Sequence, residues 1–195
     1  MEHFEKTLDI ISRAVRSIRE DEFDALKADC IDTLASGGKI VASGLGKNVP
    51  ICEKFVGTLN SVGIPAAFMH TNSAIHGDLG IIRDGDLVIV LSKSGETEES
   101  IHLVKLLSQR KCKVYLLTFT RDSTLYRATI KRLVMELEHE GDEWNILPNN
   151  STLLNLIVLQ ELAMQIIKEA SIDVETLRRN HPGGAIGARL SGEIQ

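Results

Sequence analysis

The chain has 195 residues, of which 43% are hydrophobic and 25% are charged, and its formal net charge is -5. This balance is typical of a soluble globular protein with a sizeable core. It argues against intrinsic disorder and against nucleic-acid binders, which carry basic patches. No apolar run reaches about 18 residues, and no apolar segment follows the charged N-terminus, so we expect no membrane span, no signal peptide and a cytoplasmic location.

Apolar residues spaced three and four apart predict two helices at the start of the chain, over residues 2–20 and 22–36. The glycine pair at 37–38 then predicts a helix end. Beyond it, short apolar runs predict buried strands, and the segments between them have helical patterns. The expected strands cover residues 39–43, 66–69, 86–91, 112–119 and 132–137. The expected helices cover residues 50–61, 98–110, 151–170 and 172–179.

Nearly continuous apolar strands that alternate with helices indicate a parallel sheet covered on both faces. We therefore predict an α/β fold, a three-layer α/β/α sandwich whose five-stranded parallel sheet has the doubly wound order 2-1-3-4-5. The sequence has no linker, repeat or low-complexity segment. We expect residues 1–195 to form a single domain, with N-terminal helices in 1–37 and an α/β core followed by C-terminal helices in 38–195.

Two polar, glycine-bearing loops follow the first and third expected strands. Ligands of such sheets bind beyond the carboxyl ends of the strands, near the point where the strand order reverses, and both loops are expected there. In the second loop, Ser92, Ser94 and Thr97 offer hydroxyl groups, and Gly95 lets the backbone approach a ligand closely. With the free N–H groups of the following helix, this loop predicts a phosphate site that needs no metal. The alternative is an ordinary helix cap.

The first loop carries a weaker signal. Gly44 and Gly46 resemble the start of a dinucleotide-binding fingerprint, but residue 49 is Val where a third Gly is expected. Lys47 is a candidate to pair with a phosphate or sugar oxygen, and the alternative is a surface lysine.

Two histidines lie beside glycines in polar segments, namely His76 and His181. Such histidines can titrate near neutrality and transfer protons. The neighbours His139 and Glu140 lack the spacing of metal ligands. Cys30, Cys52 and Cys112 are far apart and form no CxxC pair, so we expect neither a zinc knuckle nor a redox motif. Each cysteine is expected to be a small buried apolar residue. We expect neither a bound metal nor a cofactor.

Five segments together resemble the sugar isomerase (SIS) domain family and, within it, the arabinose-5-phosphate isomerases. They are Gly44-x-Gly46-Lys47, His76-Gly77-Asp78-Leu79-Gly80, Ser92-x-Ser94-Gly95-Glu96, Pro148-x-x-Ser151-Thr152 and His181-Pro182-Gly183-Gly184-Ala185-x-Gly187. The resemblance implies aldose–ketose isomerisation of a small phosphosugar, D-arabinose 5-phosphate with D-ribulose 5-phosphate. It also implies a homotetramer in which the His181 segment reaches a neighbouring subunit's site.

Residue by residue, the resemblance carries the family's proposed catalytic roles to Lys47, Glu99, Glu140 and His181, and a further active-site role to His76. It assigns substrate and phosphate binding to a larger set: Gly44, Gly46, Asn48, Ser92, Ser94, Gly95, Thr97, Ser151 and Thr152. The chemistry expected is an enediol route, with Glu140 and His181 transferring protons, His76 assisting ring opening and Lys47 stabilising negative charge on oxygen.

The chain departs from the family pattern in three ways, and the two departures in the presumed site leave the substrate open. Glu140-Gly141-Asp142-Glu143 stands where Glu-Ala-Cys-Pro is usual, and Pro148-Asn149-Asn150-Ser151-Thr152 stands where Pro-Thr-Ser-Ser-Thr is usual. Asn48 replaces the usual Ser, and the tandem CBS pair of many relatives is not expected here. The alternatives are an isomerase or epimerase of another phosphosugar, and a non-catalytic regulatory protein that binds sugar phosphates. Neither nucleic acid nor a membrane is an expected partner.

Overall fold

The computed structural model describes residues 2–192, and five parallel strands form its centre. Their order is β2-β1-β3-β4-β5, as the alternating pattern predicts. The strands are β1 (Ile40–Gly44), β2 (Ala66–His70), β3 (Leu87–Leu91), β4 (Lys113–Thr118) and β5 (Lys131–Val134). Every residue of β1 and β3 is buried, which explains why these two segments show continuous apolar runs rather than alternation.

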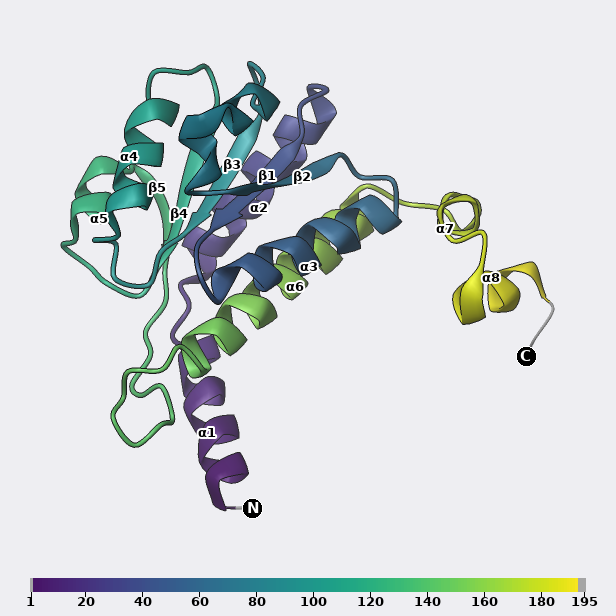
Figure 1. Ribbon diagram of the computed structural model, residues 1–195. Helices are drawn as coiled ribbons and strands as arrows, with labels where there is room; N and C mark the ends of the chain where they lie inside the picture. Colours follow the sequence, from purple (N-terminus) through teal and green to yellow (C-terminus); the bar gives the residue numbers. More distant parts are fainter. Residues whose placement is uncertain (1, 193–195) are drawn as a thin grey trace.

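Helices cover both faces of the sheet and confirm the three-layer sandwich (Figure 1). On one face pack α2 (Glu20–Ala35), α3 (Asn48–Ser61) and α6 (Asn150–Glu169). On the other pack α4 (Glu98–Leu107), α5 (Thr124–Ala128) and the 3-10 turns η1 (Ser73–His76) and η2 (Asp78–Ile81). Successive strand residues alternate between the two cores: Ile40 and Ala42 face the first, and Val41 faces the second.

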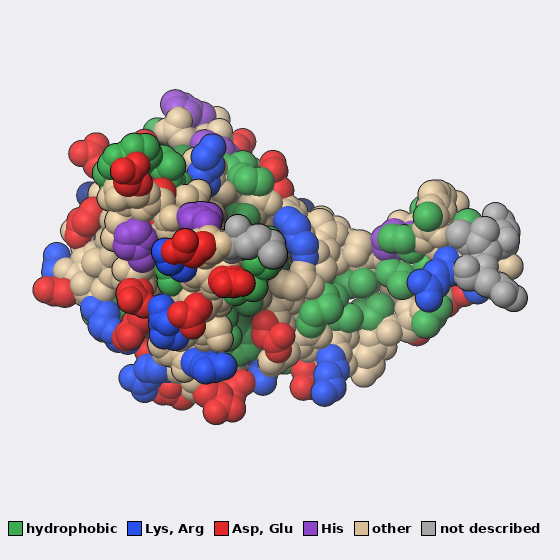
Figure 2. All heavy atoms as spheres, turned by 90° about the horizontal axis from the view of Figure 1, so that it is seen from below, with side chains coloured by type: hydrophobic (Ala, Val, Ile, Leu, Met, Phe, Trp, Pro, Cys, Tyr) green, Lys and Arg blue, Asp and Glu red, His purple; other side chains and the backbone are tan. Residues whose placement is uncertain are grey.

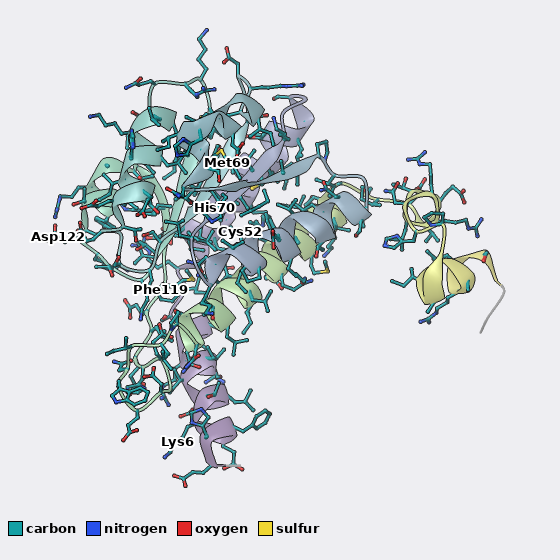
Figure 3. The ribbon with its side chains drawn as sticks, viewed as in Figure 1. Lys6, Cys52, Met69, His70, Phe119 and Asp122 are labelled. Atoms are coloured by element: carbon teal, nitrogen blue, oxygen red, sulfur yellow. The ribbon has the colours of Figure 1, made fainter. Side chains whose placement is uncertain are left out.

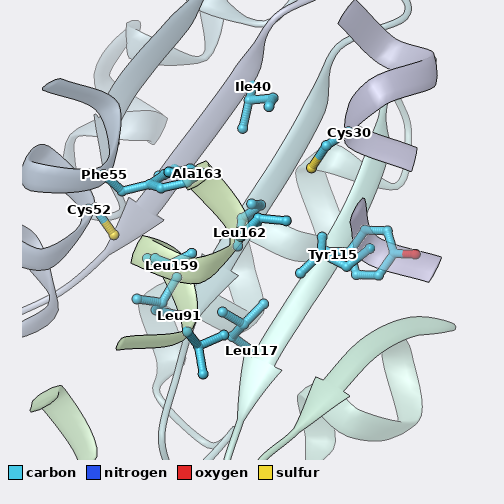
Figure 4. Packing of buried hydrophobic residues seen from close by; sticks show 14 of the residues in the cluster. Cys30, Ile40, Cys52, Phe55, Leu91, Tyr115, Leu117, Leu159, Leu162 and Ala163 are labelled. Atoms are coloured by element: carbon cyan, nitrogen blue, oxygen red, sulfur yellow. The ribbon is translucent and has the colours of Figure 1, made fainter. Parts of the chain in front are cut away.

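The first core is the larger of the two (Figure 4). Phe55 of α3 and Leu159 and Leu162 of α6 pack there against the strands. Cys30 and Cys52 are also buried in it, and burial raises the pKa of both thiols to about 12. All three cysteines are free thiols; Cys30 and Cys52 are buried as expected, whereas Cys112 is only half-buried.

The ends of several elements differ from the sequence prediction. The first helix, α1 (Glu2–Arg16), stops before residue 20, because the chain turns there and the acidic run from Glu20 opens α2. The fifth strand ends at Val134 rather than at residue 137, since its only neighbour, β4, ends at Thr118. The pattern also missed both 3-10 turns, α5 and α8 (Gly184–Ser191).

Two parts of the chain project from this body (Figure 1). Helix α1 contacts α6 and extends beyond it, leaving Phe4 and Leu8 exposed. At the other end, α7 (Val174–Asn180) and α8 form what we call the C-terminal arm, residues 172–192. Figure 2 shows the arm standing apart from the body, with hydrophobic side chains on the surface that leads to it. Among the helices described, none has the length and apolar character needed to cross a membrane.

Candidate active site

The loops after β1 and β3 meet at the point where the strand order reverses. Ser43 lies beside Val90 in the sheet, so the chain leaves both strands at neighbouring positions. The segment after β2 is tied to the same edge, because the hydroxyl groups of Ser43 and Thr71 are 2.9 Å apart and hydrogen-bonded. The three segments that carry Lys47, His76 and Ser92 thus begin side by side at the carboxyl edge.

The serine loop, residues 92–97, is held firmly by the neighbouring β4–α5 segment. Lys93 O accepts hydrogen bonds from Phe119 N and from the hydroxyl groups of Thr118 and Thr120, each at 3.1 Å. Figure 3 shows Phe119 at the end of the sheet that faces the loop leading to α6. Gly95 has a φ of +66°, and a Cβ at this position would lie 2.1 Å from the Oγ of Ser123, so the backbone requires glycine here.

Among the described residues, the hydroxyl groups of this loop donate no hydrogen bond and are therefore available to a ligand. Ser92 is buried, and its Oγ has no hydrogen-bond partner among the residues that the structure describes. Ser94 is exposed; its Oγ accepts from Glu96 N at 3.2 Å, which leaves its hydroxyl hydrogen to donate. The side chain of Thr97 does not cap α4. Three hydroxyl groups at the positive end of α4 form an arrangement suited to an anion such as phosphate.

The β1–α3 loop contributes one cation and one amide. Gly46 has a φ of +54°, and Lys47 after it is exposed. Asn48 begins α3, and its Oδ1 accepts a hydrogen bond of 3.0 Å from the Nδ2 of Asn155 on α6. Asn155 is buried and fixes the amide of Asn48 at the loop. Gly44 makes room for this helix start, because a Cβ there would lie 2.9 Å from the Cβ of Asn48.

Glu140 lies in the β5–α6 loop and is 1% exposed. Its Oε2 accepts from Asn149 N at 3.0 Å and from Ser151 N at 2.9 Å, which anchors the carboxylate at the start of α6. Its Oε1 is ion-paired with the ammonium group of Lys93. Burial acts to raise the pKa of Glu140, but hydrogen bonds from Lys93 and Ser151 outweigh it, and the net pKa lies below the usual value.

The remaining candidates differ in where they lie. Glu99 is exposed in the first turn of α4, beside the serine loop. Thr152 turns its hydroxyl back to Pro148 O and Asn149 O, at 2.9 and 2.8 Å. His76 is exposed at the end of η1.

His181 ends α7 on the C-terminal arm, which extends away from the carboxyl edge (Figure 1). Within one chain, the structure therefore brings together the two loops and Glu140 but keeps His181 apart from them.

The sequence analysis did not identify two residues of the candidate site, Lys93 and Asn155. A lysine between two serines of a phosphate loop was the available signal for the first. An asparagine between two leucines of α6 was the signal for the second. No group of three His, Cys, Asp or Glu side chains within residues 2–192 is placed to hold a metal ion.

Comparison with known proteins finds similarity over most of the chain. Residues 33–164 match the model of the SIS domain. The chain is 32% identical over 200 residues to the arabinose 5-phosphate isomerase KdsD of Pseudomonas aeruginosa, covering 97% of this chain and 61% of the relative. It is 34% identical over 157 residues to the arabinose 5-phosphate isomerase GutQ of Escherichia coli K12, covering 80% of this chain and 49% of the relative. The chain thus spans about half to three fifths of these curated relatives.

Solved structures share the fold over most of the chain. An Escherichia coli CFT073 protein in complex with arabinose 5-phosphate superposes with a TM-score of 0.84 at 28% identity, covering 93% of this chain and 95% of that one. The Vibrio vulnificus NanR protein complexed with ManNAc-6P has a TM-score of 0.73 at 16% identity, covering 91% of this chain and 65% of that one. The second likeness concerns the fold alone.

Proposed function

The chain belongs to the SIS domain family, and on that premise we propose that it is a phosphosugar isomerase that interconverts D-arabinose 5-phosphate and D-ribulose 5-phosphate. The observation that carries the proposal is the serine loop at the switch point, where the buried Ser92 hydroxyl has no partner among the described residues. The arabinose 5-phosphate isomerase names of the curated relatives, and the arabinose 5-phosphate complex of a structural neighbour, support the choice of substrate.

Phosphate binding follows from groups that are already in place. The hydroxyl groups of Ser92, Ser94 and Thr97 donate to phosphate oxygens, and the first turn of α4 adds free N–H groups and the positive end of its dipole. Lys47 and the amide of Asn48 face the sugar from the neighbouring loop. In this proposal, Lys47 stabilises the negative charge that develops on a sugar oxygen in the enediolate.

Proton transfer between the two carbon atoms is the chemical step. Glu140 has both carboxylate oxygens engaged, so it can accept a proton only by giving up one of those contacts. His181 is better suited: its Nδ1 lies 2.9 Å from Leu177 O, and a hydrogen bond donated there leaves Nε2 to accept a proton from substrate. His76 assists ring opening, and Glu99 remains a second candidate base.

We further propose that residues 1–195 act as one SIS domain in the cytoplasm and assemble as a homotetramer. Exposed apolar side chains support the assembly: Phe4 is 65% exposed on α1, and Val174 and Ile186 on the arm are 64% and 55% exposed. Besides these, Val15 and Ile157 line an open cleft of about 320 Å³ between α1, the start of α2 and α6. A neighbouring subunit that covers these surfaces also brings His181 to a site built by another chain.

The direct test is an NMR assay of the purified protein with a panel of pentose and hexose phosphates. We expect interconversion of D-arabinose 5-phosphate and D-ribulose 5-phosphate, with solvent deuterium entering at the carbon next to the carbonyl. Turnover of a different member of the panel would reassign the substrate. Binding of several sugar phosphates without turnover of any would favour a regulatory protein instead.

A further inference from the structure

Lys93 stands between the two serines of the phosphate loop, yet its side chain is directed at Glu140. The ion pair links the β3–α4 loop to the β5–α6 loop, two segments 47 residues apart in the sequence. The two partners differ in exposure: the Lys93 side chain is 44% exposed, whereas the Glu140 side chain is 1% exposed. The lysine therefore reaches from the surface of the site to a carboxylate that water does not reach.

Both ends of this ion pair are fixed by the fold. On the lysine side, Lys93 O accepts three hydrogen bonds from residues 118–120. On the glutamate side, Glu140 N donates to the Oδ1 of Asn145 at 2.7 Å, and the carboxylate accepts from Asn149 N and Ser151 N. Because both backbones are anchored, forming the ion pair orders no backbone, and its entropic cost is confined to the lysine side chain.

Other charged groups around Glu140 are directed elsewhere. His139 accepts from Gly141 N through its Nδ1, at 2.9 Å. Asp142 accepts from the backbone N–H groups of Trp144, Ile146 and Leu147. From the element packed opposite, Lys93 provides the positive charge that faces the carboxylate. The N–H groups at the start of α6 supply the rest of its stabilisation.

We propose that Lys93 is a positioning residue that holds Glu140 as a carboxylate against the start of α6 and thereby locks the phosphate loop to the β5–α6 loop. We call this connection between the two loops the lock; it sets the distance between the bound phosphate and the groups that act on the sugar. The effect of the lock on catalysis rests on the proposed isomerase function, whereas its effect on stability does not depend on that function.

Removal of the ammonium group has a defined electrostatic consequence. Burial alone raises the pKa of a carboxyl group, and in Lys93→Met that effect loses its main opposition. In the wild type the folded-state pKa of Glu140 lies below the unfolded value, so the pair stabilises the fold above the unfolded pKa and ceases to do so as pH falls through the folded pKa. In the variant the folded-state pKa of Glu140 is higher, so the carboxylate contributes less stability at neutral pH and less stability is lost as pH falls.

The kinetic test compares Lys93→Met, which keeps the alkyl chain, with Lys93→Arg, which keeps the charge. The control is Lys105→Met. Lys105 is an exposed residue of α4, and its replacement changes the net charge by the same amount as Lys93→Met. We expect Lys93→Met to lower kcat roughly tenfold or more at pH 7, to leave KM within about twofold, and to move the acid limb of the pH profile upward. Lys93→Arg should recover part of kcat, and Lys105→Met should match the wild type. A rise in KM with unchanged kcat would instead assign Lys93 to the phosphate and overturn the proposal.

The second test needs no enzymatic activity. Thermal melts at pH 7 compare Lys93→Met, Glu140→Gln and the double variant. We expect Lys93→Met to lower Tm by several degrees in the wild-type background and by much less in the Glu140→Gln background. Should Lys93→Met not fold, the double variant is expected to fold, because it leaves no unpaired buried charge.

Additive changes in Tm, in which Lys93→Met lowers Tm as much in the Glu140→Gln background as in the wild type, would overturn the lock. Coupled changes in Tm in a protein that isomerises no phosphosugar would leave the lock intact and refute the proposed function. The two failures are therefore distinguishable.

Discussion

Ser92 and Ser94 differ in the partners of their hydroxyl groups, and this difference allows binding to be separated from stability. Ser92 Oγ is buried without a partner among the described residues, so Ser92→Ala breaks no hydrogen bond to any of them. A hydrogen bond to a charged group contributes about 1.5–3 kcal/mol, so each of Ser92→Ala and Ser94→Ala should raise KM roughly tenfold or more. We expect Tm to be unchanged or slightly higher in Ser92→Ala and nearly unchanged in Ser94→Ala. Steady-state kinetics and thermal melts measure both, and an unaltered KM in both variants would place the phosphate elsewhere.

The same hydroxyl groups predict that activity does not depend on a divalent cation. Hydroxyl donors and the free N–H groups of α4 can neutralise a phosphate without a bridging metal. We expect the isomerase rate to survive prolonged dialysis against a chelator, with no gain when Mg²⁺, Mn²⁺ or Zn²⁺ is restored. Loss of activity on chelation, followed by recovery with one particular metal, would contradict this.

Single residues also show where sequence reasoning reaches its limit. Ser92, Ser94 and Thr97 were predictable, because a polar loop after a buried strand must lie at the carboxyl edge of a parallel sheet. The pairing of Lys93 with Glu140 was not, since it depends on how two loops 47 residues apart meet in space. The contact of Asn155 with Asn48 escaped for the same reason.

At the scale of elements, the interior of each strand was easier to predict than its ends. Buried residues produce the apolar run, so β1 and β3 were found nearly to the residue. The end of β5 is set by the length of β4, which the residues of β5 do not encode. Helix α5 was missed because it has five residues, too few for a periodic pattern, although Ser123 caps it by accepting from Tyr126 N.

Two glycines in different elements should respond oppositely to replacement by alanine. Gly95→Ala introduces a Cβ at a φ of +66° and 2.1 Å from the Oγ of Ser123, so we expect Tm to fall by several degrees and phosphosugar binding to be lost. Gly57 lies in the middle of α3, is exposed, and has no atom within 4 Å of a built Cβ. Gly57→Ala should therefore raise Tm by about 2–4 °C, because alanine favours the helix by roughly 1 kcal/mol. Equal effects of the two replacements on Tm would show that the serine loop is not held as rigidly as its contacts indicate.

At the scale of the whole molecule, the apolar stripe of the first helix acquires a different meaning. Its spacing predicts a face buried in the core, but Ile11 is buried whereas Phe4 and Leu8 are 65% and 54% exposed. Helix α6 behaves similarly: Leu154 is buried, while Met164 is 41% exposed. A periodic apolar pattern indicates that one face of a helix is buried, but it does not show whether the same chain or a second copy buries that face. The chain as described leaves α1 and the C-terminal arm with surfaces that a second copy can cover.

The position of the arm makes the sharing of His181 between subunits testable by mixing. We choose Lys47→Ala as the companion of His181→Ala, because Lys47 is exposed, whereas Glu140 supports the start of α6. Each variant alone is expected to be nearly inactive. In mixed oligomers, a body from the His181→Ala chain and an arm from the Lys47→Ala chain rebuild a wild-type site. Random pairing then restores about a quarter of the sites, and hence about a quarter of the wild-type activity. The two chains carry different tags, so that oligomers containing both are isolated before the assay. Activity no higher than that of the single variants in such oligomers would mean that His181 serves its own chain's site or takes no part in the reaction.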